Sequence, residues 1–488
     1  MPGLVEPPIA MENPSGMLRT PMHKALLAIM AGSLPLLFYR LGDLALDPDE
    51  GTIIRWATTL YHSDPSIVDL IQHFVRDKGF YGVYPGLNIY LTVLSFRVFG
   101  ISTWAARLPA VLIAVGTIPL FYRVADRILR NPTAALFSTL TFATSAPLLF
   151  LMRQCRYTSL TICATLWFVW AYLDLLERKP SGLPQCIGAM VLFFYTSFYI
   201  FVPVAVGVTL HCLLCTRGRS RRMALLVFVS VFLGVTLAVP SHRLSWHWPL
   251  DFLMGIWQSP PVTMLNNLRL CANEINLVGL PYALVVVFLI VTRHARSAAW
   301  LPWTAGLLWG GFVVTSSPFM TPVFEGGRVW LDQTWPGLSP WVFTRLADPR
   351  SYFIVIVTVM VSLVLRELWK PGPNAVHQLS LPILILIGTT VAFSLVFTRL
   401  VWTRYLAGTI TLSFIIVGFM LDEIRVRHRP LAIILLLLIV TSNVLSAVPL
   451  LAAHPAPWQW KLPHWVSRLA SGDPCADIVL NFWLLLPL

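Results

Sequence analysis

The sequence predicts an all-α polytopic membrane protein. Of its 488 residues, 57% are hydrophobic and only 12% are charged, whereas soluble domains contain about 25% charged residues. The mean hydropathy is +0.72, and apolar runs long enough to span a bilayer recur along the whole chain. A backbone surrounded by lipid must satisfy its hydrogen bonds internally, so we expect these runs to be helices. This composition excludes a soluble enzyme.

The net charge of +13 does not indicate a nucleic-acid-binding protein. The chain has 35 Lys+Arg against 22 Asp+Glu, but no basic stripe extends beyond a short loop. Basic loops that face anionic lipid headgroups account for such an excess equally well. The seven cysteines are scattered, so neither a zinc site nor a disulfide framework follows from them.

The elements follow from the apolar runs, taken in order. Residues 1–23 are predicted to be a cytoplasmic tail, because Arg19 and Lys24 flank a first apolar run that lacks a cleavage site, as in a retained signal anchor. The predicted spans are 24–41, 104–122, 132–151, 157–176, 222–241, 277–293, 298–318, 352–369, 379–398, 404–421 and 430–451.

Two further apolar stretches need a separate interpretation. Residues 184–216 are too long for one helix, so we expect a tight hairpin of two short helices that turns near Tyr195 to Tyr199. Residues 84–100 are apolar but short, and we expect them to lie on the membrane surface or dip into it. With these choices the chain has about 13 transmembrane helices.

Charge predicts which ends of the spans face the cytoplasm. Loops rich in Lys and Arg stay inside, and the predicted topology, with the N-terminus inside and the C-terminus outside, places every short basic cluster there. These clusters are Arg123/Arg127/Arg130, Arg178/Lys179, Arg217/Arg219/Arg221/Arg222, Arg293/Arg296, Arg366/Lys370 and Arg425/Arg427/Arg429.

One membrane domain, residues 24–451, follows from this topology. Its long outer segments are 42–103, 242–276 and 319–351, and residues 452–488 form a short extracytoplasmic tail with no assigned role. The acidic residues are densest in the first outer loop, 42–103, which predicts that any chemistry takes place on the outer face.

The first outer loop begins with three carboxylates, Asp47, Asp49 and Glu50. Asp47 precedes a proline, which is typical of a helix start. Two stretches with apolar residues at helical spacing follow, separated by Asp64-Pro65. We therefore expect two short amphipathic helices in the membrane interface that hold Asp49 and Glu50 near the lipid headgroups.

At this point the sequence resembles a known family. The acid pair is followed by Tyr84-Pro85-Gly86-Leu87-Asn88-Ile89-Tyr90, by Phe99-Gly100-Ile101-Ser102 and by Ala106-Arg107-Leu108-Pro109-Ala110. This order is similar to that of GT-C glycosyltransferases of the protein-mannosyltransferase and lipid A aminoarabinose-transferase type. The resemblance extends to about residue 176 and resumes at Thr403-Arg404-Tyr405-Leu406.

There are also departures from the family pattern. The usual His-Pro-Pro reads Val83-Tyr84-Pro85, and the acid that many members place after the second outer arginine is replaced by Tyr157-Thr158. The acceptor class and any metal site are therefore left open by the resemblance.

The resemblance implies a GT-C fold and an inverting transfer of sugar. The donor would be a polyprenyl-phosphate sugar and the acceptor a hydroxyl of a lipid, glycan or protein on the extracytoplasmic face, with the enzyme in the bacterial inner membrane. Asp49 matches the acid that accepts the acceptor's proton. Glu50 would orient the acceptor, bind a cation or support the fold.

Several basic and aromatic residues are candidates for binding the carrier phosphate. Arg153 and Arg156 occur together in a short outer turn, where two guanidinium groups can bind a phosphate; the alternative is ordinary snorkelling to the interface. Further candidates are Arg404 and Tyr405 where a late span begins, Arg243 at the start of the second long outer segment, and Tyr84 at the family's histidine position.

No cofactor is certain from the sequence, and dependence on a divalent cation stays open, because Asp47, Asp49, Glu50 and His62 are the only clustered ligand types. A transporter or flippase for lipid or polyprenyl-linked glycan is the alternative function. Transporters usually carry ionisable residues in mid-membrane and repeated halves, whereas the acids here gather in one outer loop. The segment 319–351, rich in Gly, Pro and Trp, is either a lid or an aromatic belt.

Overall fold

The computed structural model describes residues 19–43, 48–76, 80–81, 84–216, 221–230, 379–386, 388–389 and 403–452. Within these ranges the protein is helical apart from one minimal hairpin. In that hairpin β1 (Phe80–Tyr81) pairs antiparallel with β2 (Tyr84–Pro85), so that Tyr81 lies opposite Tyr84. The all-helical class predicted from composition is confirmed for the described residues.

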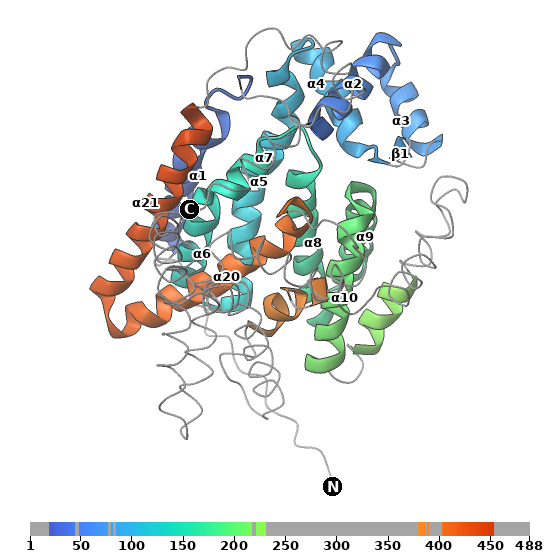
Figure 1. Cartoon of the computed structure of the whole chain (residues 1–488). Helices are drawn as coiled ribbons and strands as arrows, with labels where there is room; N and C mark the ends of the chain where they lie inside the picture. The colour runs from blue at the N-terminus through green and yellow to red at the C-terminus, as the bar shows by residue number, and fades with distance from the viewer. Residues whose placement is uncertain are drawn as a thin grey trace, which may run out of the picture.

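The helices form a bundle with a smaller group of helices at one end (Figure 1). Those of the bundle are α1 (Arg19–Phe38), α5 (Thr103–Leu129), α6 (Pro132–Thr144), α7 (Ala146–Met152), α8 (Thr158–Leu176), α9 (Gly182–Thr196), α10 (Phe198–Cys215), α20 (Thr403–Arg427) and α21 (Arg429–Ala452). The group at the end consists of α2 (Pro48–His62), α3 (Ile67–Arg76) and α4 (Leu87–Phe99).

By length and composition, three described helices can cross a membrane. They contain Thr103–Leu129, Thr158–Leu176 and Leu406–Val426, and several shorter apolar helices accompany them. The total number of crossings stays a prediction, because the expected spans at 277–293, 298–318 and 352–369 lie outside the described residues, as do the outer segments 242–276 and 319–351.

The structure tests two sequence predictions about helix breaks. The expected hairpin at 184–216 is confirmed, since α9 and α10 meet at Ser197, which has an extended backbone. The segment expected to span the membrane at 132–151 is helical but not continuous, and whether it crosses the membrane once stays a prediction. The helix is interrupted at Ser145 between α6 and α7, and Pro147 lies in the first turn of α7. In an unbroken helix the amide of residue 147 would donate to the carbonyl of Ala143, but proline has no amide hydrogen and is tolerated only in a first turn.

Helices α2 and α3 confirm the amphipathic helices expected in the first outer loop. The inward face of α2 is buried and consists of Ile53, Ile54, Ala57 and Leu60. Helix α3 begins with a reciprocal cap between Ser66 and Asp69, in which each backbone amide donates to the other side chain. It buries Leu70 but exposes Ile67, Val68 and Ile71, as expected of a helix in a lipid interface.

Three of the basic clusters that we predict to be cytoplasmic lie at the end of the bundle opposite to α2, α3 and α4 (Figure 1). Arg127 at the end of α5 lies 2.7 Å from Asp174 of α8, which also pairs with Lys179. Next to α5, Asn131 donates to Asp422 of α20, whose carboxylate pairs with Arg425. These clusters therefore share one end of the molecule, as the predicted topology requires; which side of the membrane that end faces stays a prediction.

Helix α20 packs closely against described helices of the first half of the chain. It contacts α6 and α8 through Gly418 and Gly408. A Cβ placed on Gly418 would come within 2.4 Å of the Ala134 carbonyl oxygen and within 2.6 Å of the Ser138 backbone nitrogen. Small residues at such crossings let membrane helices approach closely.

This contact predicts a strong position dependence for Gly→Ala substitutions. We expect Gly418→Ala to destabilise the protein by about 1–3 kcal/mol, because the backbone of α6 cannot move aside cheaply. Gly116→Ala is the matched control, since a Cβ at Gly116 would have no other atom within 4 Å, and we expect it to be neutral or stabilising by up to about 1 kcal/mol. Thermal midpoints in detergent measure both; equal midpoints for the two variants would contradict this packing.

Candidate active site

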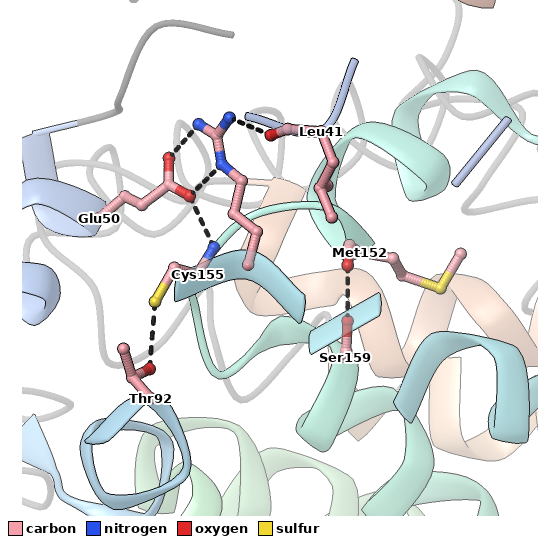
Figure 2. A network of polar contacts seen from close by, with 7 residues as sticks. Leu41, Glu50, Thr92, Met152, Cys155 and Ser159 are labelled. Carbon is pink, nitrogen blue, oxygen red and sulfur yellow. Dashed lines mark hydrogen bonds and ion pairs between the residues drawn. The ribbon is translucent and has the colours of Figure 1, made fainter. Parts of the chain in front are cut away.

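A buried ion pair connects the first outer loop to the bundle (Figure 2). The guanidinium of Arg107, in the first turns of α5, donates to both carboxylate oxygens of Glu50 in α2, with Nε–Oε1 and Nη2–Oε2 distances of 2.7 and 2.8 Å. The side chains are 2% and 0% exposed. Such a bidentate pair fixes both position and orientation. The start of α2 is therefore held against α5.

Glu50 also holds the turn between α7 and α8. Its Oε1 accepts a hydrogen bond of 2.7 Å from the backbone amide of Cys155. Burial alone raises the pKa of Glu50, but the charge and hydrogen bonds of Arg107, together with the Cys155 amide, outweigh burial and hold the pKa below its ordinary value. Glu50 is thus a carboxylate whose oxygens are already occupied by donors.

Asp49 has a different environment although it is the adjacent residue. Its Oδ2 lies 2.7 Å from Nη2 of Arg156, and its side chain is 41% exposed whereas that of Arg156 is only 3% exposed. A helix turns by about 100° per residue, so the inward direction of Glu50 leaves Asp49 at the edge of the buried face of α2. The structure therefore places an accessible carboxylate above a buried arginine.

Arg153, the other arginine of the turn, caps the end of α1. Its Nη2 donates to the carbonyl oxygen of Tyr39, and Nη1 of Arg107 donates to the carbonyl oxygen of Leu41 at 2.9 Å. The last carbonyls of a helix lack intrahelical partners, and cations at that end stabilise it. Of the two predicted phosphate ligands, Arg156 thus reaches Asp49 and Arg153 reaches α1.

The turn itself is held by two further contacts, visible in Figure 2. The Cys155 sulfur lies 3.3 Å from the hydroxyl of Thr92 in α4, and Ser159 donates to the carbonyl oxygen of Met152 at 3.0 Å. Burial, the largest effect, raises the pKa of the Cys155 thiol to about 12, so this cysteine is not a nucleophile at neutral pH.

The remaining predicted site residues are only partly described. Tyr84 lies in β2, and Arg404 and Tyr405 lie in the first turn of α20, while Arg243 is outside the described residues. Their place relative to Asp49 therefore stays a prediction.

The described residues contain no group of three or more His, Cys, Asp or Glu side chains that could hold a metal ion. His62, expected near the acid pair, lies at the far end of α2, about 20 Å from Asp49 along the helix axis. There it lines an open cleft with Asp64, Asp69 and Arg97. Asp47 is outside the described residues.

Sequence reasoning did not single out Arg107 as part of the site. The sequence did contain an indication of its role, because Arg107 lies in an otherwise apolar span, and an arginine in such a place usually has a buried acidic partner. The sequence separation of 57 residues between Arg107 and Glu50 conceals the pairing.

The buried pair predicts a large stability effect for one substitution. We expect Arg107→Ala to destabilise the protein by about 3–5 kcal/mol, because Glu50 would remain buried without its partner. Arg97→Ala serves as control, since Arg97 approaches exposed Asp64 only at 3.9 Å, and such surface pairs contribute at most about 1 kcal/mol. Thermal unfolding in detergent compares them; a wild-type midpoint for Arg107→Ala would refute the structural role assigned to the pair.

The part of the chain that contains Arg107, Arg153 and Arg156 is similar to a known family. Residues 85–246 match the family model described as dolichyl-phosphate-mannose-protein mannosyltransferase. No curated protein matches the chain.

Two solved structures of ArnT from Cupriavidus metallidurans are similar to this chain. The structure bound to undecaprenyl phosphate has 16% identity and a TM-score of 0.44, covering 91% of this chain and 67% of that one. The apo structure has 17% identity and a TM-score of 0.37, covering 82% and 78%. Scores at this level assign no residue roles. The family match confirms, over residues 85–246, the resemblance to GT-C glycosyltransferases of the protein-mannosyltransferase type.

Proposed function

We propose that this protein is an inverting glycosyltransferase that moves a sugar from a polyprenyl-phosphate carrier to an acceptor hydroxyl on the extracytoplasmic face of the membrane. The observation that carries the proposal is the pair formed by accessible Asp49 and buried Arg156, at the end of a bundle whose early helices match a family described as using a dolichyl-phosphate sugar. A carboxylate and an arginine side by side are the two groups that such a transfer needs.

Asp49 is the proposed base. The acceptor oxygen attacks the anomeric carbon while its proton passes to the Asp49 carboxylate, and the bond from that carbon to the phosphate oxygen breaks with its electron pair leaving on the phosphate. Attack from the face opposite the phosphate inverts the anomeric configuration. The exposed fraction of 41% for the Asp49 side chain gives an acceptor access to it.

Arg156 is the proposed ligand of the leaving phosphate. Its guanidinium donates charge-assisted hydrogen bonds, which strengthen as negative charge develops on the phosphate. In the structure one of its donors is directed to Asp49. The phosphate of a bound carrier would compete for this guanidinium, so donor binding would release the Asp49 carboxylate from Arg156 for contact with the acceptor hydroxyl.

Glu50 is a positioning residue in this proposal. Both its oxygens already accept hydrogen bonds from Arg107, and one of them also accepts from the Cys155 amide. It holds α2 and the turn that contains Arg156 at a fixed separation. The sequence left three roles open for Glu50: orienting the acceptor, binding a cation or supporting the fold. These contacts support the third role.

The alternative, a transporter for lipid or polyprenyl-linked glycan, is less well supported. The acids Asp174 and Asp422 of the described spans lie at helix ends, where each is paired with a basic side chain. A transport path would place such groups in mid-membrane. The accessible acid of the described site lies instead on α2, outside the spans.

The first test of this function concerns the base. We expect Asp49→Asn to lower turnover by more than about 100-fold, because an amide cannot accept the acceptor's proton. The assay is transfer from a panel of labelled polyprenyl-phosphate sugars by the purified protein in lipid nanodiscs, and the anomeric configuration of the product reports inversion. Asp43→Asn, which removes an exposed acid paired with Arg40, is the matched control. Activity of Asp49→Asn near that of wild type would reject the assignment.

The second test concerns the phosphate. We expect Arg156→Ala to weaken binding of polyprenyl phosphate by about 10–100-fold, the effect of one or two lost charge-assisted hydrogen bonds. Arg156→Lys keeps the charge but not the forked geometry, and we expect it to be intermediate. Arg97→Ala on the neighbouring surface should bind as wild type does. If Arg156→Ala retains full affinity, Arg156 acts only in the resting contact with Asp49.

A further inference from the structure

An open cleft lies at the end of α2 that is farthest from Asp49. It has a volume of about 780 Å³, within the range of sites for small ligands, about 300–1,000 Å³. The turn between α2 and α3 and the last turn of α4 form the cleft, and its polar lining includes His62, Asp64, Ser66, Asp69 and Arg97. Because the length of α2 separates it from the Asp49–Arg156 pair, by about 20 Å, the cleft is distinct from the proposed reaction centre.

The cationic group of the cleft is the guanidinium of Arg97. Its Nη2 lies 3.9 Å from Oδ1 of Asp64, which is longer than a hydrogen bond. This contact therefore leaves the N–H groups of Arg97 able to donate to a ligand. A guanidinium offers five such donors in a fixed fork that matches the oxygens of a phosphate.

Two carboxylates of the same cleft can accept hydrogen bonds from an ammonium group. The Asp64 side chain is fully exposed. Asp69 accepts a hydrogen bond of 2.7 Å from the Ser66 amide through Oδ2. Hydrogen bonds from Ser66 hold the pKa of Asp69 below its ordinary value, so that this carboxylate is charged at neutral pH. Each carboxylate has about four acceptor positions, and the amide of Ser66 uses one of them.

The charge balance of the cleft selects among ligands. Two carboxylates face one guanidinium, so a ligand with a phosphate alone meets an excess of negative charge. A ligand that carries both a phosphate and an ammonium group can pair with both kinds of side chain. A primary ammonium has three N–H donors for the carboxylates, whereas a trimethylated one has none. The charges therefore favour phosphoethanolamine over phosphocholine, and both over phosphoglycerol.

Apolar side chains adjoin the cleft on two helices. Helix α3 begins beside the cleft and exposes Ile67, Val68 and Ile71, and α4 ends beside it and exposes Val98 and Phe99. Both helices belong to the group at the end of the bundle (Figure 1). Amphipathic helices that expose such residues lie at the boundary between headgroups and acyl chains. A ligand of this cleft therefore has apolar surface to contact, which the acyl chains of a phospholipid would cover.

We propose that this cleft binds a phospholipid with a primary amine in its headgroup, with the phosphate at Arg97 and the ammonium group at Asp64 and Asp69. The site goes beyond the proposed function, because it takes part in no transfer step. It holds the far end of α2 at headgroup level, while the Glu50–Arg107 pair holds the near end. Polyprenyl phosphate carries no amine for the two carboxylates, so substitutions in the cleft leave its binding unchanged.

The test compares three lipids with identical acyl chains, phosphatidylethanolamine, phosphatidylcholine and phosphatidylglycerol. Native mass spectrometry measures their binding to delipidated full-length protein in detergent micelles. The variants are Arg97→Gln and Asp64→Asn, and asparagine tolerates the left-handed backbone of position 64, where φ is 44°. The matched controls are Asp43→Asn, an exposed acid paired with Arg40, and Arg55→Gln, an exposed arginine of α2 that does not line the cleft.

We expect wild type to bind phosphatidylethanolamine about 3–10-fold more tightly than the other two lipids, the effect of charge-assisted hydrogen bonds at a partly exposed site. Asp64→Asn should remove most of this preference and raise the affinity for phosphatidylglycerol, because a negative charge is lost. Arg97→Gln should weaken phosphatidylethanolamine and phosphatidylcholine alike by about 3–10-fold, since both carry the phosphate. Both controls should bind as wild type does.

Soluble glycerophosphoethanolamine, the same headgroup without acyl chains, separates a lipid from a free ligand, and at equal concentration it should not displace the lipid. Three results would overturn the inference. These are a wild-type preference for phosphatidylglycerol, a lipid profile of Asp64→Asn equal to that of Asp43→Asn, and full displacement by the soluble headgroup. No sugar or polyprenyl carrier is present in these measurements, so their outcome is independent of the proposed transfer reaction.

Discussion

The candidate site depends on the buried pair between Glu50 and Arg107. The first outer loop, the start of α5 and the turn before α8 meet at this pair. Arg107 also donates to the carbonyl oxygen of Leu41, which follows α1, so the segment after α1 is held at the same place. Desolvating two charges is costly, and the pair offsets that cost only because each partner makes further hydrogen bonds. A buried pair of this kind is weak evidence of stability but strong evidence of a fixed geometry, since removal of either partner leaves an uncompensated charge.

The pair also explains how two adjacent acids differ in chemistry. Glu50 is buried and its oxygens are saturated by donors, whereas Asp49 retains exposed surface and contacts Arg156. The separation comes from the pitch of α2, which turns one carboxylate inward and leaves its neighbour at the rim. The buried Glu50 thereby fixes the depth of the accessible Asp49, and in the proposed reaction it supports the reactive group.

The sequence predicts those features of the fold and the site that depend on residues close together in the chain, and it does not predict contacts between distant residues. The helices, the surface location of α2 and α3, and the hairpin at Ser197 follow from length, periodicity and breakers within one segment. Asp49 and Arg156 attracted attention by residue type and place, and the resemblance to the family suggested their roles. Their contact was not predicted, because it joins residues 107 positions apart, and neither was the capping role of Arg153. The break at Ser145 was missed although Pro147 marks it, because the apolar run continues through the proline and its length was given more weight.

The resting contact between Asp49 and Arg156 has a consequence for the order of events in the proposed reaction. Until a carrier arrives, Oδ2 of Asp49 is held by Arg156 at 2.7 Å and is not free to accept a hydrogen bond from an acceptor hydroxyl. A carrier phosphate can displace Asp49 from Arg156 because it offers more charge and more acceptor oxygens. An acceptor alcohol brings no charge and cannot do so. In the proposed reaction, Asp49 therefore becomes available to accept a proton only after the donor has bound, and an acceptor that arrives first finds Asp49 still paired with Arg156.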